Sequence, residues 1–394
     1  MSEIIPIGPY HPLQEEPEFF RLHVEGEKVV KLDIDIGYNH RGVEKLAESK
    51  SWDQVVFLVE RICGICSTSH PAASVLAMED LAEIEAPERA QYIRTVICEL
   101  ERLHSHLLWL GLAGHFLGYN TVWMWSWKYR ETVCDIFEKV TGNRQSYAMF
   151  KAGGVRRDIQ DMDIPWIRSS LEKLKPALDM FKGAVMDDPV LHARTKGIGV
   201  LTPKQAKDYC VVGPIARASG IAIDVRKDNP YFAYDWVKWD RVVLQEGDVF
   251  AKAAIRILEM YESIKIIEQC LNQMKSGPID MKVKELPPGE GIGRAEAPRG
   301  EVFHYIVSDG SNFPVRYKIR APSYVNIFSN EVACIGYQVA DAALILAAFD
   351  PCYCCTERMV AVEPKTQRKI YTGHDLIRLS HEKTFGIKKE LGLT

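Results

Sequence analysis

Several features that would assign a chain to a class at once are scarce or missing here. Ten cysteines in 394 residues, with no internal repeat and no low-complexity segment, exclude a disulfide-stapled, collagen-like or disordered chain. Positive charge is not in excess, because 49 lysines and arginines face 53 aspartates and glutamates, which argues against a nucleic-acid-binding protein. The first residues lack the basic and apolar regions of a signal peptide, so we expect a reduced, cytosolic compartment.

A hydrophobic run of the kind that spans a membrane is also missing. The stretch from Leu107 to Trp127 carries no formal charge and is long enough to cross a bilayer. It is interrupted, however, by His115, Asn120, three glycines and several tryptophans, whereas membrane spans are more uniformly apolar. We interpret it as a buried segment of a core.

The composition that remains is ordinary for a globular protein. Hydrophobic residues make up 47% and charged residues 26%, and the length suits about two to three domains. Alternating apolar residues predict one β-hairpin around a turn at residues 25–27 and another around residues 309–312. Apolar residues spaced three and four apart predict helices after Pro87, through residues 133–140 and over residues 255–273.

These patterns predict a mainly α protein (α+β), with a large helical-bundle core and small β-hairpin regions near both ends. The nearly uniform apolar stretch Val332–Phe349 predicts a helix that is buried on all sides. We expect an N-terminal hairpin region over residues 1–48, a helical core over 49–280, a hairpin with a buried helix over 281–358, and a tail over 359–394.

Two Cys-x-x-Cys pairs give the sequence its chemistry. Cys63 and Cys66 form the first pair, and Cys352 and Cys355 form the second, 289 residues further along. The spacing lets two sulfurs converge on one centre, and four thiolates are soft ligands that suit nickel, zinc or the iron of an iron–sulfur cluster. Because the pairs are so far apart in the chain, the fold itself must bring them together.

Three other interpretations of the cysteines stay open on spacing alone. A structural zinc site uses the same ligands, although zinc ribbons usually place both pairs close together in domains that lack a core. A redox dithiol needs only one pair, although neither pair lies in a strand–helix unit of the thioredoxin type. Plain burial explains the other cysteines, and Cys354, which lies between the ligands of the second pair, is ambiguous.

The surroundings of both pairs resemble those of a known family. The segments Arg61–Cys66 and Asp350–Arg358 are similar to the two metal-binding motifs of the nickel–iron hydrogenase large subunit. Similarity to the energy-converting, membrane-associated branch extends to Gly8–Pro12, Gly37–Lys45, Glu101–His106 and Gly153–Asp158. That branch is related to the quinone-site subunit of respiratory complex I, whose members lack the four cysteines kept here. The resemblance therefore implies a working hydrogenase.

The resemblance also implies roles for the cysteines. Cys63 and Cys352 would be terminal ligands of nickel, and Cys66 and Cys355 would bridge nickel to an iron that carries carbon monoxide and cyanide. Heterolytic cleavage of dihydrogen needs a base beside the metal, and the thiolate of Cys352 would accept the proton.

Three further residues match the family's pattern around these metals. Arg299 would lie beside the diatomic ligands, where a permanently charged fork of donors steadies cyanide and polarises the open metal position. Pro322 and Ser323 resemble the residues that contact a cyanide.

The resemblance gives Glu16 the position of a proton-relay glutamate, with Glu15 as the neighbouring alternative. A relay carboxylate should be partly buried and have a raised pKa. His11 and His40 would either continue the proton path or be ordinary core histidines.

Glu44 matches a carboxylate that binds a divalent ion, often magnesium, in other hydrogenase branches. The partner ligand there is a C-terminal histidine, whereas this sequence has Arg358, whose side chain does not ligate magnesium. An ion pair between Arg358 and Glu44 is the alternative to that ion.

Together these inferences predict the catalytic large subunit of an energy-converting nickel–iron hydrogenase, working with a low-potential donor such as ferredoxin. No further cysteine set suits an iron–sulfur cluster, so electrons would arrive through an iron–sulfur small subunit. Further iron–sulfur and integral membrane subunits would hold the chain peripherally on the cytoplasmic side of the cell membrane. The alternatives are a sulfur- or quinone-linked module of the complex I type and a zinc-stapled structural subunit.

The tail adds one more expectation. In many hydrogenases a maturation peptidase cuts after the position that Arg358 occupies here. A retained tail would instead have apolar residues with which to dock: Ile370, Tyr371, Leu376, Ile377 and Leu379.

Overall fold

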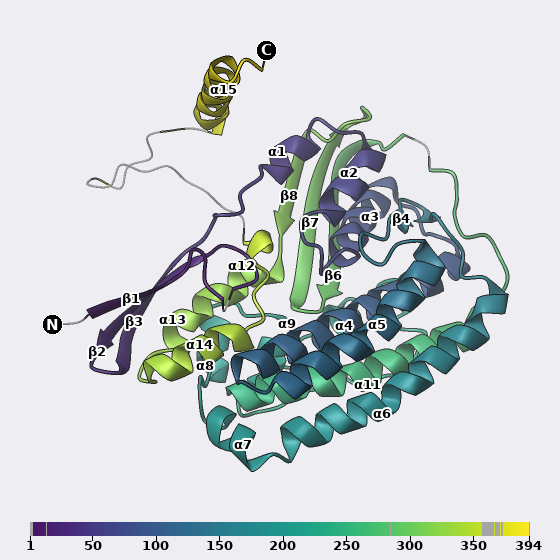
Figure 1. Ribbon diagram of the computed structural model, residues 1–394. Helices are drawn as coiled ribbons and strands as arrows, with labels where there is room; N and C mark the ends of the chain where they lie inside the picture. Colours follow the sequence, from purple (N-terminus) through teal and green to yellow (C-terminus); the bar gives the residue numbers. More distant parts are fainter. Residues whose placement is uncertain are drawn as a thin grey trace.

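The computed structural model describes residues 3–12, 14–283, 285–356, 366, 371 and 373–393. It is mainly α-helical with small antiparallel sheets, as the sequence predicts (Figure 1). Four long helices, α4 (Glu88–Phe116), α5 (Asn120–Thr141), α6 (Ile164–Met186) and α11 (Val249–Gln273), lie side by side and form the central bundle.

Shorter helices surround this bundle. They are α1 (Val43–Ala47), α2 (Trp52–Glu60), α3 (Ser69–Ala82), α7 (Pro189–Thr195), α8 (Pro203–Asp208), α9 (Gly213–Ala218), α10 (Val225–Asp228), α12 (Pro322–Asn326), α13 (Asn330–Ala333), α14 (Val339–Ala348) and α15 (Gly373–Glu390). The 3-10 turns are η1 (Asp161–Asp163), η2 (Ile327–Ser329) and η3 (Tyr353–Cys355). The strands are β1 (Glu3–Ile7), β2 (Phe19–Glu25), β3 (Lys28–Asp35), β4 (Phe150–Lys151), β5 (Gly154–Val155), β6 (Pro288–Ala297), β7 (Gly300–Asp309) and β8 (Arg316–Arg320).

Helix α4 is buried around its whole circumference. Its predicted apolar positions are buried, and so are the charged residues Arg94, Glu99, Glu101 and Arg102. The helix ends at a left-handed glycine, Gly118, a conformation that glycine adopts without steric cost. The uncharged stretch 107–127 is therefore divided between two helices. The prediction that it is a buried core segment is wrong for its second half, where Met124, Trp125 and Trp127 are exposed. Among the described residues, no helix is long and apolar enough to cross a membrane.

Both predicted hairpins are present, and each gains a third strand. Strand β1 pairs with β2 of the first hairpin, and β6 pairs with β7 of the second, all antiparallel. Helix α3 lies directly on β6, because Gly291 and Gly293 leave room for its backbone. A Cβ at Gly293 would lie 1.9 Å from the carbonyl oxygen of Ala73.

The predicted continuous helix Val332–Phe349 is wrong in two respects. The chain forms two helices, α13 and α14, separated at Gly336, which has a left-handed φ of +86°. The intervening segment bonds to the first hairpin instead, with the amide of Gly336 donating to the carbonyl of Val29 at 2.8 Å. The first residues of α14 are also partly exposed. Pairing with a strand edge satisfies the backbone groups that helix formation would have used.

The C-terminal helix α15 stands apart from the body of the molecule (Figure 1). Tyr371, Ile377 and Leu379 are exposed, so these residues do not dock as expected of a retained tail. Arg358, Ile370 and the side chain of Leu376 lie outside the described residues.

Candidate metal centre

The two cysteine pairs meet in the interior. Cys63 and Cys66 lie in the loop between α2 and α3, whereas Cys352 directly precedes the 3-10 turn η3 and Cys355 is its last residue. The sulfurs of Cys63 and Cys352 are 2.9 Å apart, and all four cysteines are buried. The fold thus closes the gap of 289 residues that separates the two pairs in the chain.

The turn η3 adds a fifth sulfur to the cluster. The sulfurs of Cys63, Cys352, Cys354 and Cys355 lie within 4.8 Å of one another. Among the described residues, this is the one group of potential ligand side chains close enough together to hold a single metal ion. Cys66 lies outside that group, and its sulfur accepts from a guanidinium nitrogen of Arg299 at 3.4 Å. The geometry therefore brings in Cys354, which the resemblance leaves without a role.

Crowding of the sulfurs makes one thiolate easy to form. The pKa of Cys63 lies well below its usual range, chiefly because the thiol of Cys352 donates a hydrogen bond to its sulfur. The pKa of Cys355 lies well above its usual range, chiefly because its thiol hydrogen-bonds to Cys352, with burial adding to the shift. A site of this kind favours a cation that neutralises several thiolates at once.

Arg299 is fully enclosed at the turn between β6 and β7. Its Nε donates to the backbone oxygen of Asp350 at 2.7 Å and one Nη to the Asp350 carboxylate at 2.6 Å. The other Nη contacts Ser105 and Cys66. The backbone can pass close to α9 because Gly213 lacks a Cβ, which would lie 2.4 Å from the Arg299 carbonyl oxygen.

Asp350 joins the second cysteine motif to two buried arginines. Its backbone has a left-handed φ of +52°, which aspartate tolerates better than most residues. Arg256 approaches its carboxylate to 3.7 Å, while the Nε and one Nη of Arg256 make no hydrogen bond. Arg299 thus borders the sulfur cluster directly, and Arg256 is linked to it through Asp350 and retains unused donors.

Pro322 and Ser323 begin helix α12, and both are buried. The hydroxyl of Ser323 accepts a hydrogen bond from the backbone N–H of Cys352 at 3.0 Å. The start of α12 therefore lies against a candidate ligand, and proline is well suited to the first helical position.

Three glutamates precede strand β2, and they differ in environment. Glu16 is half-buried and accepts from the backbone N–H of Cys354 at 2.5 Å. Glu15 keeps an exposed side chain, yet surrounding protein atoms displace enough water to raise its pKa to about 7. Glu18 is fully buried and accepts from the hydroxyl of Thr356 at 2.7 Å, and burial raises its pKa to about 8. His11 and His40 both have exposed side chains.

A buried histidine that the sequence analysis did not single out lies beside the cluster. His70 Nε2 is 3.6 Å from the sulfur of Cys355, and His70 Nδ1 is 3.1 Å from Nε2 of His304. Spacing gives no signal for this histidine, because the residues it contacts, Cys355 and His304, lie far along the chain. Burial lowers the pKa of His70 to about 4, so the imidazole is neutral near pH 7.

Two charged residues hold the first cysteine loop in place. Arg41 donates to the backbone oxygens of Arg61 and Ile62, the latter at 2.7 Å. The carboxylate of Glu101 accepts from the backbone N–H and the hydroxyl of both Thr68 and Ser69, directly after the loop. Both belong to motifs that carry the family resemblance, but their roles depend on contacts that spacing does not reveal.

Glu44 already has protein partners. Its carboxylate accepts from the backbone N–H of Ile319 at 2.9 Å and pairs with the ammonium of Lys318 at 3.1 Å. The proposed partner Arg358 lies outside the described residues. A lysine in contact with the carboxylate competes with a divalent cation there.

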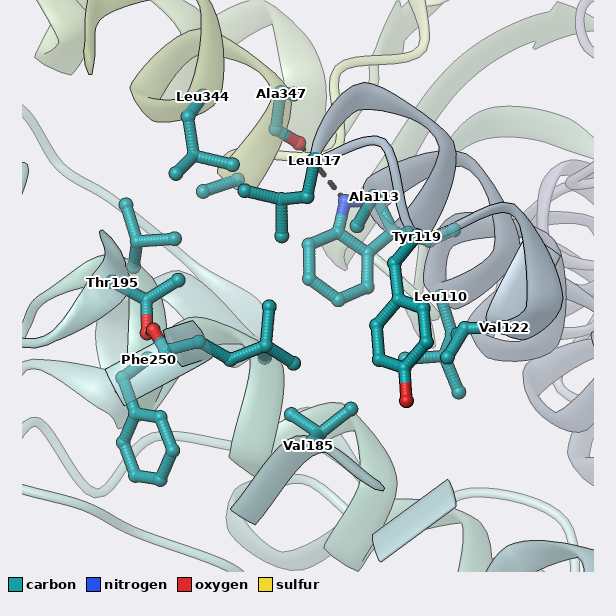
Figure 2. Close-up of a pocket in the computed structure, with 16 residues that line it drawn as sticks. Leu110, Ala113, Leu117, Tyr119, Val122, Val185, Thr195, Phe250, Leu344 and Ala347 are labelled. Carbon is teal, nitrogen blue, oxygen red and sulfur yellow. Dashed lines mark hydrogen bonds between the residues drawn. The ribbon is translucent and has the colours of Figure 1, made fainter. Parts of the chain in front are cut away.

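An apolar cavity of about 40 Å³ lies behind the centre, between α4, α7, α11 and α14. Figure 2 shows side chains such as Leu117, Val185 and Phe250 around this space. The indole of Trp109 separates the cavity from Arg256, whose guanidinium carbon lies 4.3 Å from the ring centroid. The cavity therefore comes within one side chain of the Arg256–Asp350 pair.

Comparison with known proteins agrees with this fold and site. Residues 117–286 and 279–358 match the family model described as respiratory-chain NADH dehydrogenase, 49 Kd subunit, and residues 41–113 match that of nickel-dependent hydrogenase. The chain is 41% identical to the membrane-bound hydrogenase subunit alpha of Pyrococcus furiosus, over 96% of this chain and 93% of the relative. It is 39% identical to the carbon monoxide-induced hydrogenase of Rhodospirillum rubrum, over 90% and 99% respectively.

A solved structure is similar over nearly the whole chain as well. It is that of a membrane-bound sulfane sulfur reductase, an archaeal respiratory membrane complex, with a TM-score of 0.87 and 35% identity. The match covers 91% of this chain and 98% of that one.

Fold and site thus define a hydrogenase-type oxidoreductase subunit with a buried cysteine cluster compatible with metal binding. The chain belongs to the nickel–iron hydrogenase large-subunit family, in the energy-converting, membrane-associated branch that is related to the 49 kDa subunit of complex I.

Proposed function

We propose that the protein is the catalytic large subunit of an energy-converting nickel–iron hydrogenase. It reduces protons to dihydrogen, or oxidises dihydrogen, with electrons relayed from a low-potential donor such as ferredoxin. The observation that carries this proposal is the buried cluster of sulfurs from both Cys-x-x-Cys pairs, bordered by Arg299.

The residues of the cluster fit a nickel–iron group with carbon monoxide and cyanide ligands. Soft thiolates suit nickel and low-valent iron. The unpaired donors of Arg256 and the fork of Arg299 suit small anionic ligands that accept hydrogen bonds. When bound, this group would supply the redox chemistry of dihydrogen, and Cys63, Cys66, Cys352 and Cys355 would hold it.

The protein's own groups then move protons and orient the reactants. Cys352 accepts the proton released from dihydrogen. Glu16 then passes this proton outward, and its carboxylate is held nearby by the backbone N–H of Cys354. Asp350 holds two of the guanidinium nitrogens of Arg299, and the third faces the sulfur of Cys66 at 3.4 Å. The hydroxyl of Ser323 fixes the backbone of Cys352, and Pro322 and Ser323 would contact a cyanide of the bound group.

Arg299→Lys tests the role of the fork. Lysine keeps the positive charge but offers a single donor group in place of a planar pair, so the metals should stay while turnover falls about 100-fold. Metal content and hydrogen evolution of the same preparation, measured together, separate the two effects. Loss of the metals with the activity would make Arg299 an assembly residue instead.

The apolar cavity supports a small, nonpolar substrate. Dihydrogen has no polar group to hydrate, so it partitions into apolar space more readily than a charged substrate does. The cavity beside Trp109 offers such space within one side chain of the Arg256–Asp350 pair.

Electrons and membrane attachment come from partner subunits in this proposal. An iron–sulfur small subunit delivers electrons, and further iron–sulfur and integral membrane subunits hold the chain at the cytoplasmic side of the cell membrane. The Pyrococcus relative and the sulfur reductase structure belong to membrane-bound complexes, which supports a peripheral position.

The decisive experiment is an infrared spectrum of the complex purified anaerobically from its own host. Metal-bound carbon monoxide and cyanide absorb where protein barely does, so their bands identify the nickel–iron group. A Cys352→Ser variant should lose hydrogen turnover and show disturbed metal loading. Absence of the bands and of nickel from mature complex, or unchanged turnover in the variant, would overturn the proposal.

A second function is favoured by the sulfane sulfur reductase structure, which shares 35% identity and this fold. A sulfur-reducing module would take electrons from the same kind of donor and release sulfide instead of dihydrogen. Assaying both products from one metal-loaded complex distinguishes the two. Sulfide without dihydrogen would favour the second function. Zinc without nickel in native protein would instead favour a structural subunit.

Maturation of the tail is tested by mass spectrometry of the isolated subunit. A chain that ends at Arg358 means that a maturation peptidase has acted, and a full-length chain means that the tail is retained.

A further inference from the structure

A chain of buried hydrogen-bonding groups leads from Cys355 into the β6–β8 sheet. His70 Nε2 lies 3.6 Å from the Cys355 sulfur, and His70 Nδ1 lies 3.1 Å from His304 Nε2. His304 Nδ1 lies 2.9 Å from the hydroxyl of Tyr317, which in turn lies 2.8 Å from Ser74 Oγ. All four side chains of the chain beyond the cysteine are essentially inaccessible to solvent.

The elements that carry these groups are held together by the way α3 lies on the sheet. His70 and Ser74 are one turn apart on α3, and His304 and Tyr317 come from the neighbouring strands β7 and β8. In the register of these strands, Tyr317 pairs with Ile306, two residues from His304, so both side chains point to the same face. The helix covers that face closely because Gly293 admits its backbone.

The hydrogen bonds that link Cys355 to Ser74 can run in either of two directions. His70 Nδ1 and His304 Nε2 face each other at 3.1 Å and share one hydrogen bond, so one of these two nitrogens carries the N–H and the other is bare. If Tyr317 donates to Ser74, every bond runs away from Cys355, and His70 presents a bare nitrogen that only a thiol can satisfy. If Ser74 donates to Tyr317, every bond runs toward Cys355, and His70 presents an N–H to the sulfur. Hydroxyl groups rotate and serve either direction.

We propose that His304, Tyr317 and Ser74 are positioning residues that hold His70 with its proton on Nε2, so that the ring donates a hydrogen bond to the metal-bound thiolate of Cys355. This inference rests on the proposed function, because a metal-bound thiolate carries no proton and can only accept. The chain thus acts on the metal through one hydrogen bond to one ligand.

That hydrogen bond has a measurable electronic effect. A donor to a ligating sulfur withdraws electron density from it, and hydrogen bonds to such sulfurs tune reduction potentials. Without the donor, Cys355 gives more electron density to the metals, and more passes into the carbon monoxide ligand. The carbon monoxide band should then move to lower wavenumber, and the midpoint potential should fall.

The test compares infrared spectra of three variants of the full complex with wild type. Tyr317→Phe removes the far donor, and His304→Leu removes the contact to His70, so the band should shift down in both, and further in the second. His304→Gln restores a donor near the position of Nε2, so its band should return toward wild type. Tyr92→Phe is the matched control, because it also removes a hydroxyl from a buried tyrosine that bonds to a side chain, Gln273.

The outcomes separate this inference from the proposed function. Carbon monoxide and cyanide bands that are absent from wild type reject the proposed function itself. Bands that are present but unmoved in Tyr317→Phe and His304→Leu, with only a lower melting temperature, reject the inference and make the chain a packing feature. If His304→Leu fails to assemble, Tyr317→Phe decides, because its ring still fills the same space.

Discussion

At the scale of single residues, the sequence carries the chemistry but leaves the exact donor set open. The two cysteine pairs, Arg299 and Ser323 were all singled out from the sequence, and the structure gathers them within one buried region. His70 and Asp350 were missed, because their importance lies in a sulfur and a guanidinium contributed from far along the chain. Long-range contacts of this kind have no local sequence signal.

Cys66 and Cys354 compete for one place in the ligand set. The family pattern assigns Cys66, whereas the structure puts Cys354 among the four closest sulfurs. Serine oxygen is a poor donor for soft metals, so Cys66→Ser should abolish both metal loading and hydrogen turnover. Cys354→Ser should retain both, because its backbone N–H still bonds to Glu16. Nickel content and hydrogen evolution measured for each variant check this, and the reverse pattern would reassign the ligand.

Glu18 should make stability depend on pH. Its pKa rises from 4.5 in the unfolded chain to about 8 in the folded one, because burial disfavours the charge. The folded state therefore binds one more proton between these values, so stability is greatest below pH 4.5 and falls as pH rises toward 8, by up to about 1.4 kcal/mol per pH unit. Glu18→Gln cannot ionise and should lack this contribution.

Melting temperatures of wild type and Glu18→Gln at several pH values from 5 to 9 test the prediction. The melting temperature of the variant should rise relative to that of wild type as pH rises, and the difference should level off above pH 8. A constant difference across the range would mean that Glu18 is already ionised in the folded protein.

At the scale of elements, periodicity predicted helices and hairpins well wherever one face or the whole surface is buried. It failed over 332–349, where composition is apolar enough for a helix but Gly336 and the free edge of β3 draw the chain into strand-like pairing. The third strands, β1 and β6, were also missed. The period of β6 is obscured by glycines, which are needed for contact with α3 and carry no hydrophobic signal.

Gly293 should therefore be intolerant of any side chain. A Cβ there would overlap the Ala73 carbonyl at 1.9 Å and the Ala77 nitrogen at 2.5 Å, so Gly293→Ala must push α3 off the sheet. Overpacking typically costs about 1–3 kcal/mol, and here the displaced helix begins at the cysteine loop. We expect a lower melting temperature and reduced nickel content. Gly277→Ala, where a Cβ meets nothing within 4 Å, is the control, and equal effects of both changes would contradict this account.

At the scale of the whole molecule, buried charges join the elements that surround the centre. Arg217 of α9 bonds to Glu259 of α11 and to Glu296 of β6, both at 2.7 Å, and lies 3.4 Å from Asp224. Glu259 also contacts His106 of α4 at 3.0 Å. A sequence gives no warning of such a network, because charged residues on helices are usually assigned to a solvated face.

Removing the central cation of this network should destabilise the fold far more than removing a comparable cation at the surface. Arg217→Met leaves the buried carboxylates of Glu259 and Glu296 without their cation, whereas Asp224 keeps Arg226, and breaking a buried pair typically costs about 3–5 kcal/mol. Arg144→Met is the matched control, since Arg144 also pairs with three carboxylates, Glu131, Asp135 and Glu138, but in solvent, where each pair contributes about 1 kcal/mol or less. Thermal unfolding of both variants measures the contrast. Adding Glu259→Gln to Arg217→Met should recover part of the loss, because it removes one of the stranded charges. Equal melting temperatures for the two single variants would show that water reaches the network and screens it.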